Sequence, residues 1–199
     1  MPYVLTVDQI DSRSSVDLVH DTLARLADSP TILPFTRTVG DEFQGLLDTA
    51  VSVVDVILML MRSAQWHIGL GIGSVQRPFT APDSRAARGD AFLAARTAVE
   101  RAKVEPSHLA VNAVGPEADA EDVETVFRLV GALRSRRTDP GWQVVDLLSA
   151  GHTQQQAATR LDISRQAVSQ RAHTAAWSLE QSAVPTLVRL LDRADQAVS

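Results

Sequence analysis

The sequence has no cysteine, no long apolar run and no signal-like start. Without cysteine the 199-residue chain forms no disulfide and no thiolate metal site, which suits a reducing compartment. The most apolar stretch, AVSVVDVILMLM at 50–61, contains Asp55 and is shorter than the roughly 20 residues that cross a bilayer. The start, MPYVLTVDQID, lacks the basic and apolar regions of a signal peptide. We therefore expect a cytoplasmic protein with no membrane partner.

An excess of basic charge is also missing. The formal net charge is −5, which argues against a protein that binds nucleic acid over its whole surface. DNA contact needs only one basic face, however. The run RLVGALRSRR at 128–137 is followed by Arg160, Arg165 and Arg171, whereas the N-terminal half is the acidic one. We expect any contact with DNA in the C-terminal half.

Hydrophobic patterns in the first 114 residues predict alternating strands and helices. Strands are predicted at 3–8, 31–39, 42–47, 66–75 and 108–114, and helices at about 15–27, 48–63 and 87–103. Gly40 and Asp41 form the bend between the second and third strands. The fourth strand, WHIGLGIGSV, contains glycines that allow another group to approach its backbone closely.

The order β-α-β-β-α-β, followed by a helix and a strand, predicts an α+β fold with a ferredoxin-like antiparallel sheet. The composition changes at GPEADAED (115–122), so we place a domain boundary there, with domains at 1–117 and 118–199. The second domain is predicted to be all-α, with helices at roughly 120–137, 140–150, 153–160, 164–177 and 184–196.

Two aspartates define a candidate metal site. Asp8 ends the first strand and Asp41 lies at the bend, and strands 1 and 3 are neighbours in a ferredoxin-like sheet. Two such carboxylates can share Mg²⁺, which prefers oxygen ligands and retains substrate phosphates. Aspartate is also common at turns for backbone reasons alone, so a solvated turn is the alternative.

The hairpin stretch TVGDEFQGLL (38–47) resembles that of class III nucleotide cyclases and the GGDEF signature of diguanylate cyclases, with Val39 replacing the first glycine. TVDQIDS (6–12) resembles the first metal strand of both, and WHIGLGIGSV and RGDAFLAAR are similar to a cyclase strand and helix. Over about residues 3–180 the chain resembles the SatD family, whose members carry GDEFQGL in a cyclase-like domain followed by a helix-turn-helix.

This resemblance implies a palm-like domain, as in nucleotide cyclases, that binds Mg²⁺ and a purine nucleotide. The implied metal ligands are Asp8 and Asp41, and the implied nucleotide contacts are Gln9, Gly40, Glu42 and Arg96. The cyclase helix has an asparagine where this chain has Leu93, and Arg96 falls one residue early. Leucine donates no hydrogen bond, and losing one such donor typically costs ~10²–10³ in rate. We therefore expect this site to bind a ligand rather than to catalyse.

The five histidines show no ligand-like spacing along the chain.

Residues 153–177 have the pattern of a DNA-binding helix-turn-helix. A short helix is followed by a tight turn at 162–164, where Asp162 replaces the usual glycine and tolerates a left-handed backbone. Arginine reads guanine, glutamine reads adenine and serine contacts phosphate. The predicted DNA-binding residues are Ser164, Arg165, Gln166, Ser169, Gln170 and Arg171. The alternative is a helical hairpin used for dimerisation or protein contact.

Two functions compete on these observations. The first is a DNA-binding transcriptional regulator whose N-terminal domain binds a nucleotide and metal or assembles a homodimer. The second is an enzyme of the nucleotide cyclase type that makes a second messenger. Leu93 favours the first, because it removes a donor that the reaction requires. A third option is an inert dimer scaffold that positions the DNA-binding helices. The expected partners are double-stranded DNA, a second copy of the chain and a nucleotide.

Overall fold

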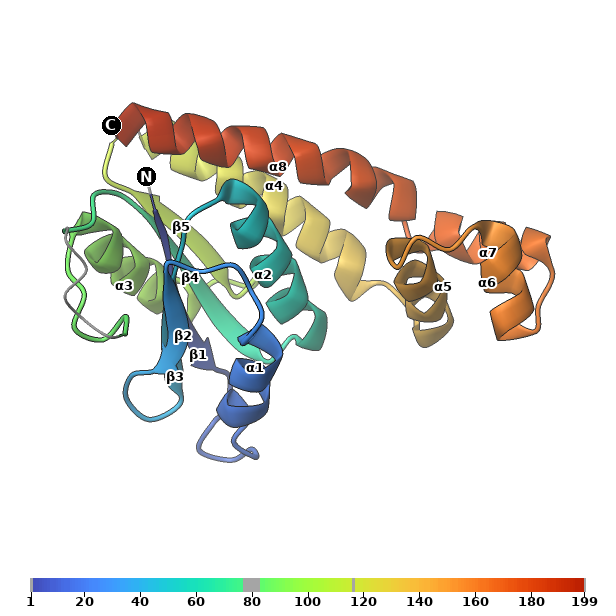
Figure 1. Ribbon diagram of the computed structural model, residues 1–199, viewed down its shortest axis with the longest axis horizontal. Helices are drawn as coiled ribbons and strands as arrows, with labels where there is room; N and C mark the ends of the chain where they lie inside the picture. The colour runs from blue at the N-terminus through green and yellow to red at the C-terminus, as the bar shows by residue number, and fades with distance from the viewer. Residues whose placement is uncertain (1, 77–82, 116, 199) are drawn as a thin grey trace. The chain divides into compact units, whose positions relative to one another are not determined.

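The computed structural model describes residues 2–76, 83–115 and 117–198, which form a five-stranded sheet and eight helices (Figure 1). The fold is therefore α+β, as predicted. The chain divides into two compact units: a first unit of residues 1–128 and 186–199, and a second unit of residues 129–185. The second unit is thus inserted between two parts of the first. These units do not coincide with the predicted division after residue 117, since residues 118–128 and 186–199 belong to the first unit.

The sheet of the first unit has the strand order β2-β3-β1-β4-β5. Strand β1 pairs antiparallel with both β3 and β4, β2 pairs antiparallel with β3, and β5 pairs parallel with β4. All five strands lie within the predicted segments, give or take one residue: β1 (Tyr3–Gln9), β2 (Leu33–Arg37), β3 (Glu42–Leu47), β4 (Trp66–Ile72) and β5 (Leu109–Ala113).

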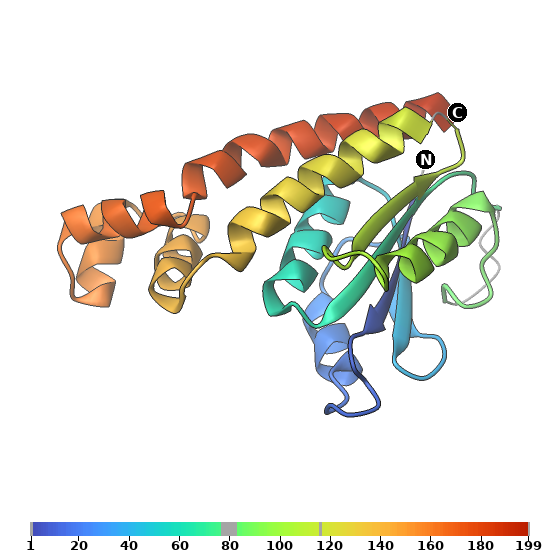
Figure 2. The same ribbon diagram turned by 180° about the vertical axis from the view of Figure 1, so that it is seen from behind.

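Helices cover both faces of this sheet. Figures 1 and 2 show α3 (Asp90–Ala102) on one side and α1 (Val19–Leu26) with α2 (Ala50–Ser63) on the other. Gly69 and Gly71 permit the close packing of α3 on β4. A Cβ atom at Gly69 would lie 2.3 Å from the backbone nitrogen of Val99, and one at Gly71 would lie 2.1 Å from the carbonyl oxygen of Ala91. The group that approaches this glycine-rich strand is therefore a helix.

Two long helices contribute residues to both units, α4 (Glu117–Ser135) and α8 (Trp177–Val198). Within the first unit they lie side by side, and Arg193 of α8 contacts Asp119 and Asp122 of α4 at 2.6 and 2.5 Å (Figures 1 and 2). The prediction that the last helix begins at 184 was wrong. Helix α8 continues through Pro185, although proline lacks a backbone donor. Glu180, one turn before Pro185 in the same helix, is buried.

The second unit contains the three short helices α5 (Asp139–Ser149), α6 (Gln154–Leu161) and α7 (Arg165–Thr174). Hydroxyl side chains at their N-termini accept backbone hydrogen bonds: Thr138 caps α5, Thr153 forms a capping box with Gln156 on α6, and Ser164 caps α7. The core between the helices consists of Val144, Ala157, Ala158, Val168 and Ala172. Among all described residues, no helix combines the length and the hydropathy that a membrane span requires.

Candidate functional site

The first candidate site is a row of polar side chains on the sheet face that α3 covers. Asp8 of β1 is paired with Glu42 of β3 and with His67 of β4. Directly paired residues of antiparallel strands project to the same face, so these three side chains are neighbours. His67 shares this face with Gly69 and Gly71, against which α3 packs. The row therefore lies beside α3, which carries Arg96 and is followed directly by Lys103.

Both carboxylates of the row face a cation, one from α3 and one from Lys103, the residue that directly follows this helix. Arg96 forms an ion pair with Glu42, and Nζ of Lys103 lies 3.4 Å from Oδ2 of Asp8. Glu42 is buried, and its second carboxylate oxygen accepts a hydrogen bond of 2.6 Å from the hydroxyl of Thr38. The structure therefore brings the predicted nucleotide contacts Glu42 and Arg96 together, but pairs them with each other.

Asp41 differs from its neighbours because its side chain has no hydrogen bond or ion pair with any described residue. It is half-buried in the turn before β3, next to Gly40, whose φ of 63° is the left-handed conformation that the bend requires. The described residues contain no group of three or more acidic or histidine side chains that could hold a metal. Mg²⁺ at Asp8 and Asp41 would therefore need phosphate and water oxygens to complete its shell.

Gln9 has a structural use in this arrangement. Its side-chain amide donates to Oγ of Ser15 at 2.9 Å and to the carbonyl oxygen of Val16 at 2.7 Å, and its oxygen accepts from the backbone of Leu18 at 2.9 Å. The buried side chain thereby holds the loop that precedes α1. A nucleotide contact at Gln9 would have to use the main chain.

The remaining residues of GDEFQGL hold β3 in the sheet, between β2 and β1. Phe43 packs edge-to-face on Phe35 and Trp66, at ring distances of 6.0 and 5.2 Å. A Cβ atom at Gly45 would lie 2.5 Å from the Phe35 ring, so glycine makes room for that ring. Gln44 donates to the carbonyl oxygen of Ser84 at 3.1 Å, and the hydroxyl of Ser84 donates back to the Gln44 carbonyl at 2.8 Å. Most of the motif therefore stabilises the fold around Asp41.

Sequence spacing gave no sign that two histidines meet beside this row. His67 of β4 and His108, which directly precedes β5, bring their Nδ1 atoms to 3.3 Å although 41 residues separate them. Burial lowers the pKa of His67, and the nearby His108 lowers it further. Nδ1 atoms at this distance share one hydrogen, so at least one ring is neutral in this contact.

The second candidate site is the solvent face of α7. Arg165, Gln166, Ser169 and Gln170 are exposed, whereas Val168 and Ala172 of the same helix are buried. None of these four polar side chains has an intramolecular partner among the described residues. The turn before α7 has Asp162 at φ 51° and ψ 47°, as predicted, and Ser164 accepts from the backbone of Ala167 at 3.1 Å. Arg171 is half-buried, and exposed His173 and Thr174, which the sequence analysis did not include, extend the polar face.

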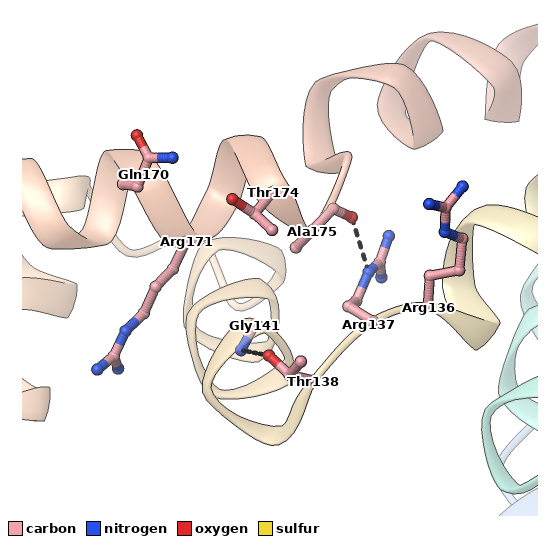
Figure 3. Close-up of a pocket in the computed structure, with 8 residues that line it drawn as sticks. All are labelled: Arg136, Arg137, Thr138, Gly141, Gln170, Arg171, Thr174 and Ala175. Carbon is pink, nitrogen blue, oxygen red and sulfur yellow. Dashed lines mark hydrogen bonds between the residues drawn. The ribbon is translucent and has the colours of Figure 1, made fainter.

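A pocket lies between the start of α5 and the last turns of α7, entirely within the second unit (Figure 3). Its wall contains three arginines and no acidic residue. The lining residues are Arg136, Arg137, Thr138, Gly141, Gln170, Arg171, Thr174 and Ala175. Gln170 and Arg171 of this group were predicted from the sequence as DNA-binding residues, whereas no sequence pattern indicated the pocket.

A buried charge cluster lies behind the pocket. Glu180 accepts hydrogen bonds of 2.5 Å from both Arg134 and Arg137, and the two guanidinium groups lie 4.8 and 4.6 Å from the centre of the Trp142 ring. Arg137 also donates through Nε to the carbonyl oxygen of Ala175 at 2.8 Å. Glu180 is thus shared by two buried cations.

The SatD family model matches residues 7–184, which is most of the chain. No curated protein matches the chain, and neither does any solved structure. The protein belongs to the SatD family.

Proposed function

We propose that this SatD-family protein is a DNA-binding transcriptional regulator that reads DNA with α7. The observation that carries the proposal is the set of four exposed, unpartnered polar side chains on one helix: Arg165, Gln166, Ser169 and Gln170. Exposed side chains that form hydrogen bonds with no other part of the chain are available to a partner. In this proposal α5 is the supporting helix, and α6 and α7 form the helix-turn-helix.

The chemistry of these residues suits base recognition. Arginine donates two hydrogen bonds to guanine, glutamine pairs with adenine in the same two-bond manner, and serine contacts phosphate. Arg165 and Gln166 occupy the first turn of α7, and in helix-turn-helix proteins it is the N-terminal residues of the second helix that contact base edges. We therefore assign base contact to Arg165 and Gln166, and further contacts to Ser169 and Gln170.

The N-terminal domain in this proposal is a ferredoxin-like, cyclase-palm-like module that binds a purine nucleotide with Mg²⁺ or joins two copies of the chain. The strand order β2-β3-β1-β4 and the free carboxylate of Asp41 support it. Asp8 and Asp41 would hold the metal, which would neutralise phosphate charge. Two DNA half-sites about one helical turn apart require two reading helices, so the active form is a homodimer.

The acidic row around Asp8 also favours a second candidate, an enzyme that makes a nucleotide second messenger. Two observations count against it. Leu93 is 71% exposed on α3 and offers no donor to a ribose, and Arg96 is already paired with Glu42. Incubation of the protein with Mg²⁺ or Mn²⁺ and each nucleoside triphosphate tests this candidate, and a cyclic or condensed product would establish it.

Selection of bound fragments from genomic DNA tests the regulator. We expect the wild-type protein to enrich a small set of sequences and Arg165→Ala to lose that enrichment, with α-helical content unchanged. Arg25→Ala, which removes an exposed arginine from α1, is the matched control and should retain the enrichment. Equal enrichment by wild type and Arg165→Ala would exclude α7 as the reading helix, and no enrichment by the wild type would exclude the regulator.

A further inference from the structure

We infer that the pocket between α5 and α7 binds one phosphate group of the DNA backbone, at the edge of the groove that α7 reads. This inference rests on the proposed function and extends it to Arg136 and Arg137, which lie outside the predicted set of DNA-binding residues. The pocket is lined by positive charge. Arg136, Arg137 and Arg171 line the pocket, and no lining residue is acidic. A pocket with such a wall attracts an anion, and the nearby Glu180 offsets only part of the positive charge.

Arg137 contributes a further buried cation to the pocket. The side chain of Arg137 is fully buried, its Nε binds the Ala175 carbonyl and its Nη2 binds Glu180. Its Nη1 has no hydrogen-bond partner among the described residues. Because Nη1 is buried and the guanidinium lies 4.6 Å from the centre of the Trp142 ring, Arg137 would act on an anion in the pocket through its charge, and Arg136 and Arg171 would supply the direct hydrogen bonds. Figure 3 shows the hydrogen bond from Arg137 to the carbonyl oxygen of Ala175, with Arg136 on one side of Arg137 and Arg171 on the other.

The N-terminus of α5 also borders the pocket. The pocket includes Thr138 and Gly141 from the first turn of α5, an eleven-residue helix whose N-terminus carries partial positive charge. The N–H of Gly141 donates to the hydroxyl of Thr138, and the side chains of Arg137 and Ala175 pack against Gly141, so this helix end acts on an anion through its partial charge. The chemistry of the pocket therefore matches a phosphate, which accepts several hydrogen bonds and forms two-pronged contacts with arginine.

The position of the pocket on α7 relates it to the DNA groove that this helix is proposed to read. The pocket shares Gln170 and Arg171 with α7 and extends to Thr174. Eight residues separate Gln166 from Thr174, which is about 12 Å along an α-helix. The major groove is also about 12 Å wide. A strand that borders the groove read by Arg165 and Gln166 would therefore pass at the pocket, which favours a backbone phosphate over a free one.

Salt dependence of DNA binding tests this inference, because each neutralised phosphate contributes about 0.9 to the slope of log affinity against log salt concentration. The full chain is titrated with a labelled duplex of random sequence over a series of salt concentrations. We expect Arg136→Gln/Arg171→Gln to reduce the slope by about 1 and to weaken binding by the same factor for every sequence. Arg25→Gln, which also removes an exposed arginine, should leave the slope unchanged. Circular dichroism checks that each variant is folded.

The outcomes separate the inference from the proposed function. If the wild type binds the duplex and the double variant keeps the full slope, the pocket does not hold a backbone phosphate and the regulator still stands. If the wild type binds no duplex even at low salt, the regulator and this inference both fail. Calorimetry with inorganic pyrophosphate distinguishes the source of the phosphate. The inference is overturned if the wild type binds pyrophosphate and the double variant does not, while both have the same salt dependence of DNA binding. The pocket would then be a site for a free phosphate.

Discussion

The two units differ in what their charged side chains do. In the first unit many carboxylates are paired across elements: Glu42 with Arg96, Asp8 with Lys103, and Glu124 with Arg101. On α7 of the second unit the reverse holds, since Arg165 and its polar neighbours have no partner among the described residues. Charges that are paired within the chain stabilise the fold, whereas unpaired exposed ones are available for binding.

Each unit contains an exception that sharpens this comparison. Asp41 is the unpaired carboxylate beside the paired row of the first unit, and the Arg134–Glu180–Arg137 cluster is the paired interior of the second. If pairing separates structural charges from functional ones, substitution in the Glu180 cluster should change stability. Substitution of Asp41 should instead change ligand binding.

The largest effect is expected for Glu180→Ala. This change leaves Arg134 and Arg137 buried without their anion, and breaking a buried pair in this way costs about 3–5 kcal/mol. Urea unfolding followed by tryptophan fluorescence measures the free energy of unfolding. Glu121→Ala on the exposed side of α4 is the control, and we expect it to stay within about 0.5 kcal/mol of the wild type. Similar values for the two variants would contradict a structural role for the cluster.

Asp41→Asn is expected to act on binding alone. Removing the charge should weaken binding of Mg²⁺ with ATP or GTP by about 1.5–3 kcal/mol, the range for hydrogen bonds to charged groups, and should leave the unfolding free energy unchanged. Isothermal calorimetry in the presence of Mg²⁺ measures the first quantity. Asp48→Asn, an exposed aspartate at the other end of β3, is the control. If neither nucleotide binds the wild-type protein, the first unit has no nucleotide function, and dimerisation remains its proposed role.

Local patterns predicted the elements well and the contacts between them poorly. The strands and α6–α7 follow from alternation, helical spacing and turn residues within short segments, so every strand and the Asp162 turn were found. The Glu42–Arg96 pair joins residues 54 apart, and no short-range pattern indicates it. The same is true of the hydrogen bond between Gln44 and Ser84, because these residues are 40 positions apart in the chain. Such contacts depend on how strands and helices pack.

A smaller pair of effects tests the row in the first unit. Glu42→Ala should cost about 1–3 kcal/mol, because it removes a buried acceptor used by both Thr38 and Arg96. Arg96→Ala should cost about 1 kcal/mol or less, since the arginine side chain is 60% exposed and its charge is screened by water. Urea unfolding gives both values. Equal losses would show that the pair itself, rather than the burial of Glu42, sets the cost.

The smallest effect is a pH dependence of stability from His67. Burial and then the neighbouring His108 lower its pKa in the folded state below the ordinary value of 6.5, while a hydrogen bond with the backbone of Ala102 and the charge of Asp8 partly oppose this shift. The unfolded chain therefore takes up a proton first as the pH falls below 6.5, and the folded state loses stability in that window. Thermal unfolding of the wild type between neutral and mildly acidic pH should show a falling melting temperature, and His67→Gln should flatten that slope. His20→Gln, exposed on α1, should retain it. An unchanged slope in His67→Gln would mean that neither burial nor contact with His108 lowers the pKa of His67 in the folded state.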